Sequence, residues 1–284
     1  MACSHVNRFA LLLALSSTSC SLALHTDGEQ CATDADCAAR GVDFADTECQ
    51  ARVCVEKQQV EPIDLKWGCI GKVEPVAPGT MIDIELRLLD IITQAPPAGL
   101  TIKLCNRYDT PCAAPIKNAT MDAEGWVKVT LPSAVEAYLD VTGAGYMPSI
   151  VMLDPVATSK NPEHLLVSTA IAESLATTAG VALDPAAAIV NVFMTDCTLA
   201  ATAGASVTIF PSSTETRFYI ISSTTNPNGS QTDSSGNAGF VNVAPGTPTL
   251  TGTVGPQGKV FGELSTLSRA GHLTYQILRP TPSL

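Results

Sequence analysis

The chain has 284 residues, of which 27 are Asp or Glu and 16 are Lys or Arg, and its formal net charge is −11. An apolar fraction of 45% is that of a globular protein, which excludes disorder along the whole chain, and the length predicts about two domains. Because the sequence has no run of Lys or Arg that would neutralise phosphates, we expect no nucleic-acid partner.

The first segment has the features of an export signal. Arg8 precedes a short apolar stretch, residues 9–15, and small residues then lead to Cys20. Such a stretch fits a cleaved signal and is far shorter than the roughly 20 residues that span a bilayer. We assign residues 1–19 to a signal peptide and expect an exported protein.

Cys20 lies in a context that resembles a bacterial lipobox, in which the cysteine carries a lipid. Ser17 stands three positions before it, where the lipobox pattern has Leu, so cleavage by an ordinary signal peptidase stays open. We expect lipidation of Cys20, with the membrane as a partner through this lipid and the protein held at the outer membrane or cell surface. Without the lipid the protein would be periplasmic or secreted.

The cysteine pattern predicts disulfides rather than a metal site. An even set of eight cysteines in an exported chain indicates four disulfides; they are Cys31, Cys37, Cys49, Cys54, Cys69, Cys105, Cys112 and Cys197. The first four belong to an acidic stalk, residues 20–66, which is too short to bury a core and leaves three pairings open. Further along, we expect Cys105 to pair with Cys112 and Cys69 with Cys197. No spacing is C-x-x-C, so we expect neither a metal nor a cofactor.

From about residue 67 the sequence contains two copies of one strand-and-turn pattern. Each copy has an alternating apolar segment, a strand after a small-Gly turn, and a D-x-x-G turn that opens a third strand. The D-x-x-G turns run from Asp122 to Gly125 and from Asp233 to Gly236. Asp can accept backbone hydrogen bonds and Gly adopts positive φ, so we interpret these turns as structural rather than calcium-binding.

This pattern predicts a mainly β protein. Period-two runs separated by turns are typical of antiparallel strands with one buried face, as in β-sandwiches of transthyretin or immunoglobulin type. We expect two such domains, residues 67–157 and 183–284, joined by residues 158–182. This linker is predicted to contain a helix over residues 162–179, capped by Asn161 and stopped by Gly180.

Three motifs resemble those of the carboxypeptidase regulatory-like, or transthyretin-like, β-sandwich family. They are Ala98-Gly99-Leu100-Thr101-Ile102, Thr120-x-Asp122-x-x-Gly125 and Gly145-Tyr146-x-Pro148. The second copy retains Thr232-Asp233-x-x-Gly236 but has no G-Y-x-P. Together with the acidic four-cysteine segment, the chain is similar to surface lipoproteins of myxobacteria. The resemblance implies a binding, spacing or accessory module without catalytic residues of its own.

The sequence offers no catalytic motif. It has no G-x-S-x-G, no H-E-x-x-H and no phosphate-binding glycine loop. His164 and His272 are about a hundred residues apart, and we interpret both as hydrogen-bonded structural residues. We therefore expect no enzyme activity.

Aromatic side chains are the remaining candidates for a site, because an exposed ring can stack on a sugar. The candidate binding residues are Trp126, Tyr108 and Tyr146, although the start of a strand leaves Trp126 either exposed or in the core, and we favour the core. We expect a non-catalytic role in adhesion or in binding envelope polysaccharide or a surface protein. The alternatives are an accessory subunit or weak hydrolase acting on extracellular polymer, and a structural spacer.

Overall fold

The computed structural model describes residues 30–41, 44, 47–50, 52–56, 66–74, 77–133, 135–153 and 163–281. The chain divides into two units, Met1–Glu61 and Pro62–Leu284, and each is described by itself. The expected signal peptide and the expected lipidation site, Cys20, lie outside the described residues.

The first unit is a small structure held by cross-links. Its elements are a helix, α1 (Asp34–Ala38), and a hairpin of β1 (Thr47–Gln50) and β2 (Val53–Glu56). Disulfides join Cys31 to Cys49 and Cys37 to Cys54. Cys49 and Cys54 face each other across the hairpin, so the two bonds fasten both strands to the α1 segment. The Asp36 carboxylate caps α1 by accepting the N–H groups of Ala32 at 2.9 Å and Thr33 at 2.7 Å, and these hydrogen bonds lower its pKa.

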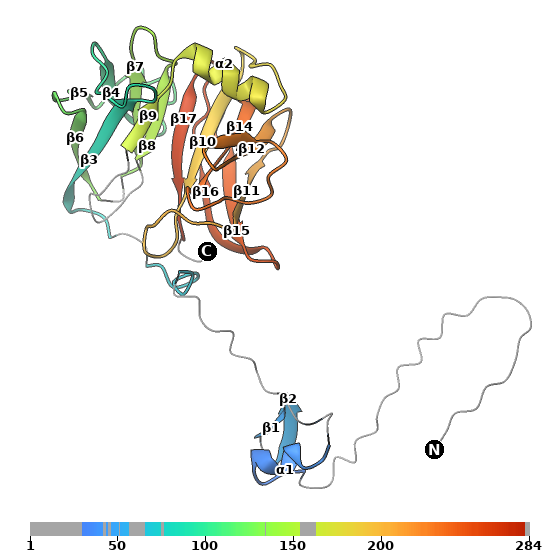
Figure 1. The fold of residues 1–284 in the computed structure, drawn as a ribbon. Helices are drawn as coiled ribbons and strands as arrows, with labels where there is room; N and C mark the ends of the chain where they lie inside the picture. The colour runs from blue at the N-terminus through green and yellow to red at the C-terminus, as the bar shows by residue number, and fades with distance from the viewer. Residues whose placement is uncertain are drawn as a thin grey trace, which may run out of the picture. The chain divides into compact units, whose positions relative to one another are not determined.

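Within the described residues, the second unit has fifteen strands and one helix. They are gathered around one large sheet (Figure 1). Its elements are β3 (Met81–Asp90), β4 (Thr101–Asn106), β5 (Lys117–Ala119), β6 (Trp126–Pro132), β7 (Ala137–Thr142), β8 (Ser149–Leu153), β9 (Glu163–Leu166), α2 (Thr169–Thr178), β10 (Ala188–Met194), β11 (Ala205–Phe210), β12 (Thr216–Ile221), β13 (Thr224–Asn226), β14 (Asn237–Val243), β15 (Thr249–Val254), β16 (Lys259–Ser265) and β17 (Leu273–Leu278). The large sheet has nine strands in the order β13-β12-β14-β10-β17-β8-β7-β4-β5, and two three-stranded sheets, β6-β3-β9 and β11-β15-β16, accompany it.

The two small sheets cover opposite sides of the large one. In the register of β10, β17 and β8, Tyr275 and Val151 lie on one side, while Val190, Thr274 and Ile150 lie on the other. Tyr275 and Val151 belong to the core between the large sheet and the β6-β3-β9 sheet. Val190 belongs to the core between the large sheet and the β11-β15-β16 sheet. The large sheet therefore contributes to both cores.

The repeat predicted from the sequence recurs in the strand pairing. β3 pairs antiparallel with β6 and parallel with β9, and β10 pairs in the same way with β14 and β17. Likewise β7 lies between β4 and β8 as β15 lies between β11 and β16. In both copies the carbonyl of the glycine in the D-x-x-G turn accepts a hydrogen bond from a strand. The Leu88 N–H donates to the Gly125 carbonyl at 2.9 Å, and the Met194 N–H donates to the Gly236 carbonyl at 2.7 Å. Each copy is thus a β-sandwich.

The two sandwiches are continuous, whereas the sequence led us to expect two separate domains, residues 67–157 and 183–284. β8 of the first copy pairs in parallel with β17 of the second, so that one sheet runs through both copies. In addition, Trp67, which was expected at the start of the first sandwich, packs on the core of the second copy. The centres of its ring and of the Phe261 ring are 4.9 Å apart. Pro62–Leu284 is therefore a single compact unit.

The helix between the copies is also shorter than expected. Glu163–Leu166 forms β9 instead of helix, because it adds to β3 in parallel and buries Leu166, and this pairing outweighs the local capping signals. The helix α2 begins after Ser168, whose hydroxyl accepts the Ile171 N–H, and Asn161 lies outside the described residues. Gly180 follows its end at φ +86°, as expected. Within the described residues no helix is both long and apolar enough to cross a membrane.

The disulfides of this unit join the pairs that the sequence led us to expect. Cys105 is bonded to Cys112, seven residues away, and closes a loop between β4 and β5. Cys69 is bonded to Cys197, 128 residues away, and fastens the segment around Trp67 to the second copy. The Cys197 N–H donates to the Lys66 carbonyl at 2.9 Å, which adds to the same attachment.

Candidate functional site

Trp126 lies on the outer side of the β6-β3-β9 sheet, so the expectation that it belongs to the core is wrong. Residues alternate along β6: Val127 and Val129 are fully buried, whereas the Trp126 side of the strand faces outward and Trp126 is 41% exposed. The sequence W-V-K-V-T-L contained this signal, because a period-two pattern places Trp126 on the same side as Lys128 and Thr130.

The D-x-x-G turn fixes the backbone of Trp126. Oδ1 of Asp122 accepts the N–H groups of Trp126, at 2.7 Å, and Glu124, at 3.1 Å. Gly125 adopts φ +89°, and a Cβ at this position would meet the Leu88 carbonyl oxygen at 2.7 Å. The turn therefore needs glycine for its conformation and for its close contact, and this carboxylate oxygen of Asp122 is engaged by the chain itself.

Charged side chains surround Trp126 and form pairs across the strands. The Arg87 guanidinium lies 5.8 Å from the centre of the Trp126 ring and 2.9 Å from a carboxylate oxygen of Glu163. Next along the sheet, Lys128 donates to Glu85 at 2.8 Å, and this carboxylate raises the pKa of the lysine. The outer side of the sheet therefore combines an aromatic ring with paired charges.

A shallow groove of about 430 Å³ runs beside the Trp126 ring. Its lining comes from β3, β6 and the segment before the D-x-x-G turn: Glu85, Thr120, Met121, Asp122, Trp126 and Lys128. Oδ2 of Asp122 and the hydroxyl of Thr120 have no hydrogen-bond partner among the residues that the structure describes. The groove thus offers an aromatic and thioether surface, free acceptors, a hydroxyl and an ammonium group. We call this set the Trp126 groove.

The other two aromatic candidates lie on different elements and do not join the Trp126 groove. Tyr108 is 83% exposed in the loop between β4 and β5. Tyr146, in the turn between β7 and β8, packs on the core and donates to the Asp90 carboxylate. Burial, together with this hydrogen bond, raises the pKa of its phenol. The three candidates are therefore not one aromatic platform.

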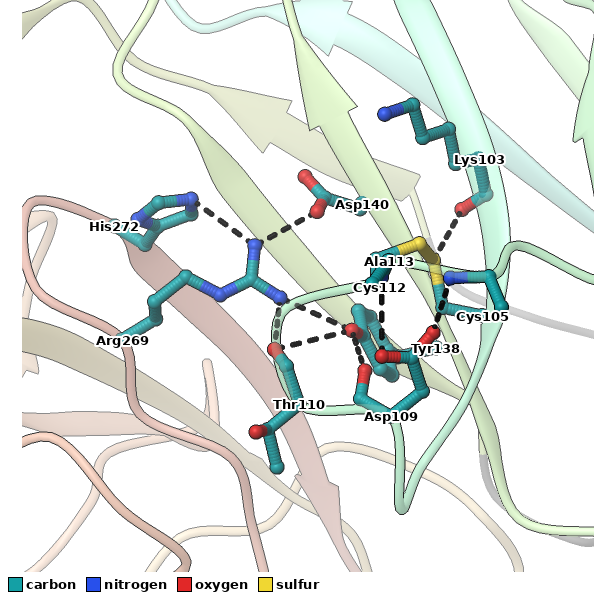
Figure 2. The surroundings of a disulfide bond; sticks show 11 residues. Lys103, Cys105, Asp109, Thr110, Cys112, Ala113, Tyr138, Asp140, Arg269 and His272 are labelled. Carbon is teal, nitrogen blue, oxygen red and sulfur yellow. Dashed lines mark hydrogen bonds and ion pairs between the residues drawn. A yellow bond between two sulfur atoms is a disulfide. The ribbon is translucent and has the colours of Figure 1, made fainter.

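A second polar cluster, centred on Arg269, was not predicted from the sequence. Figure 2 shows the Arg269 guanidinium between Asp140, at 2.7 Å, and the backbone carbonyl of Thr110. It also donates to the hydroxyl of Tyr138 at 3.0 Å, and this hydroxyl donates to the Asp109 carbonyl at 2.6 Å. The cluster therefore fastens the loop before β17 to β7 and to the loop closed by the Cys105–Cys112 disulfide.

His272 takes part in this cluster in its neutral form. Its Nε2 lies 3.3 Å from Nη1 of Arg269, which can only donate, and its Nδ1 lies 2.8 Å from the Ala270 carbonyl. Accordingly Nε2 accepts and Nδ1 carries the proton. Burial and the neighbouring guanidinium lower the pKa of His272. Its partners are structural, as expected from the sequence.

His164 is buried in β9 rather than placed at the start of a helix. Its ring packs edge-on against Tyr275, with 5.5 Å between the ring centres, and burial lowers its pKa to about 4. The Tyr275 hydroxyl donates to the Leu165 carbonyl, and burial raises the pKa of this phenol. A neutral imidazole in this position contributes packing.

Among the described residues, two groups of potential metal ligands have their ligand atoms within 4.8 Å of one another. They are Cys31, Cys37 and Cys54 in the first unit, and Cys105, Cys112 and Asp140 in the second. All five cysteines are in disulfides and therefore offer no thiolate, and Asp140 is paired with Arg269. These groups are structural cross-links.

No family model and no curated protein matches the chain. Among solved structures it is similar to the Bacillus anthracis TIE protein, with 13% identity and a TM-score of 0.25, over 72% of this chain and 34% of that one. It is also similar to the shaft pilin SpaA of Lactobacillus rhamnosus GG, with 14% identity and a TM-score of 0.23, over 72% and 100% of the two chains. The minor pilin GBS52 of Streptococcus agalactiae gives 12% and 0.23, over 72% and 98%. The chain thus spans about a third of the TIE protein.

Proposed function

We propose that this chain is an exported, non-catalytic binding protein of the cell surface, and that it binds through the Trp126 groove. The observation that carries the proposal is the half-exposed Trp126 ring beside free polar groups on the outer side of a sheet. A large exposed ring costs solvation free energy, and such rings in concave, mixed surfaces are typical of binding sites. The role is adhesion or capture of an extracellular ligand.

Export is supported by the disulfides. Four bonds join the eight cysteines among the described residues, and such bonds persist in oxidising compartments outside the cytoplasm. Anchoring by a lipid on Cys20 is part of the proposal and rests on the sequence context of this cysteine.

The chemistry of the groove supports binding rather than hydrolysis. A glycosidase needs one carboxyl group that is protonated and shielded, together with a second that is ionised. In the Trp126 groove, Glu85 is paired with Lys128 and Asp122 is engaged by two backbone N–H groups, and both line an open depression. The accessory role on extracellular polymer remains compatible with this arrangement, because it also needs only binding.

The test has two parts, which use the full-length protein in the cells that produce it. Protease added to intact cells should degrade the protein, and labelled fatty acid should enter the wild type but not C20A. Purified protein should sediment with isolated envelope, W126A should lose most of this binding, and Y108A, a change at another exposed aromatic, should keep it. Protection from protease or equal binding by W126A would contradict the proposal.

A further inference from the structure

The repeat provides an internal comparison for the Trp126 groove. Because Gly125 and Gly236 occupy the same place in their turns, Trp126 corresponds to Asn237 and Lys128 to Gly239. In the second copy this side of the sheet is closed: Gly239 is buried, and a Cβ there would meet the Phe218 ring at 2.6 Å. The strand-and-turn pattern therefore does not require an aromatic residue at this position. Of the two copies, the first, whose outer side is open, has an aromatic ring there, and the second has Asn237.

The same comparison extends to β3 and β10. Leu88 corresponds to Met194 because each donates to the turn glycine, so Glu85 and Arg87 correspond to Asn191 and Phe193. Asn191, Phe193 and Arg87 are all partly buried, whereas Glu85 is exposed. The open side thus carries charges where the closed side carries uncharged side chains.

The arrangement of charges at the Trp126 groove disfavours an anionic ligand. Both cations are already paired with carboxylates, Arg87 with Glu163 and Lys128 with Glu85. The free acceptor Oδ2 of Asp122 adds further negative charge. A phosphate or uronate would have to displace a carboxylate from its cation and approach another.

A cationic ligand is disfavoured by the position of Arg87. Cations bind aromatic rings through the ring face, and the Arg87 guanidinium already lies 5.8 Å from the centre of the Trp126 ring. A second cation on the same face of the ring would be repelled by this guanidinium. The groove is therefore expected to favour a polar ligand without net charge.

A neutral sugar ring matches all of these groups, and we propose that the Trp126 groove binds neutral oligosaccharide. The apolar C–H side of the sugar would stack on the Trp126 ring and contact Met121. Its hydroxyl groups would donate to Oδ2 of Asp122 and exchange hydrogen bonds with Thr120 and Lys128. The volume of about 430 Å³ lies within the range of small-ligand sites. This inference rests on the proposed function and names its ligand class.

The test is a titration of the purified protein with defined probes. Neutral probes are cellopentaose, maltopentaose and fully N-acetylated chitopentaose; a galacturonate oligomer is the anionic probe and oligolysine the cationic one. Calorimetry on wild type should detect at least one neutral probe. Its affinity should fall about tenfold or more in W126A, fall less in W126F, and stay unchanged in Y108A, because stacking on one ring supplies much of such binding. Urea unfolding of each variant shows that the fold is retained.

Each result decides the ligand class. A neutral probe that binds and depends on Trp126 supports the proposal, whereas tighter binding of the galacturonate oligomer or oligolysine, equal affinity in W126A, or no binding of any neutral probe overturns it. The envelope sedimentation assay separates this failure from failure of the proposed function. If W126A loses envelope binding but no neutral probe binds, then the groove is a binding site for another ligand.

Discussion

Arg269 and Asp140 form an ion pair at 2.7 Å between two copies of the repeat, 129 residues apart in the sequence. Asp140 lies on β7 of the first copy, and Arg269 lies in the loop that leads into β17 of the second. The pair therefore lies close to the parallel pairing of β8 with β17, which makes the two sandwiches one sheet. We infer that this ion pair stabilises the junction of the two copies.

Replacing Arg269 by Met should be strongly destabilising. The side chains of Arg269 and Asp140 are only 22% and 10% exposed, so the variant leaves the Asp140 carboxylate without its charged donor and removes one donor from the Thr110 carbonyl. We expect the free energy of unfolding to fall by about 2–4 kcal/mol. R87M is the matched control, because the pair of Arg87 with Glu163 is more exposed and should contribute less than about 1 kcal/mol. Equal losses in urea unfolding would show that the Arg269 cluster does not stabilise the junction.

The buried histidine His164 should make the protein less stable as the pH falls below about 6.5. Burial lowers its folded pKa to about 4 from an ordinary value of 6.5, so the unfolded chain binds the proton more readily. The loss should approach about 3 kcal/mol by pH 4, and His272, whose pKa is also lowered, should add to it. The carboxylates with lowered pKa values, such as Asp90, lose their contribution only below about pH 4.

The measurement is urea unfolding of wild type and H164F between pH 7.5 and 4.5. Phe keeps a ring against Tyr275 but cannot bind a proton. H164F should lose a large part of the pH dependence over this interval. A dependence as steep as that of wild type would mean that other groups cause it.

The two disulfides of the second unit should differ in their contributions. In the chain-entropy description, a bond that closes the 128-residue separation between Cys69 and Cys197 stabilises by about 5 kcal/mol, and one that closes the seven-residue separation between Cys105 and Cys112 by about 2.5 kcal/mol. The double variants C69S/C197S and C105S/C112S, compared by urea unfolding under oxidising conditions, test this order. A larger loss from C105S/C112S would show that its effect on the Arg269 cluster exceeds the entropy difference.

The turn glycine Gly125 should tolerate no side chain. Alanine there would require φ +89° and would place its Cβ 2.7 Å from the Leu88 carbonyl oxygen, so we expect a loss of about 2–4 kcal/mol. Gly145 has a similar φ, +88°, but a Cβ added there would meet no atom within 4 Å, and G145A should lose only about 1 kcal/mol. Similar losses in thermal unfolding would mean that the contact with Leu88 yields easily.

The sequence predicts those features that depend on local chemistry. The mainly β class and the repeat could be predicted from two local signals, because each arises within a few residues. These signals are the alternation of apolar and polar residues along β3 and β6, and the Asp and Gly of the D-x-x-G turns. Glu163–Leu166 was assigned wrongly because its short E-H-L-L pattern suits a helix or a strand, and only pairing with β3 decides between them.

Long-range pairing explains what was missed. Ser149–Leu153 is buried on both sides, so its sequence has no alternation and does not indicate which strand lies beside it. Its pairing with β17, and with it the continuity of the sheet and the Arg269–Asp140 ion pair, depends on segments more than a hundred residues apart. The exposure of Trp126 was predictable, since Lys128 and Thr130 share its side of β6.

The central claim, that the Trp126 groove binds a neutral sugar, is tested most directly by the two indole N–H signals of the protein in a ¹⁵N NMR spectrum. The sequence has two tryptophans, and Trp67 is packed against Phe261, whereas Trp126 lines the groove. On addition of the neutral oligosaccharide that binds in calorimetry, the Trp126 signal should shift in a saturable way and the Trp67 signal should stay in place. A saturable shift elsewhere with an unmoved Trp126 signal would contradict the account.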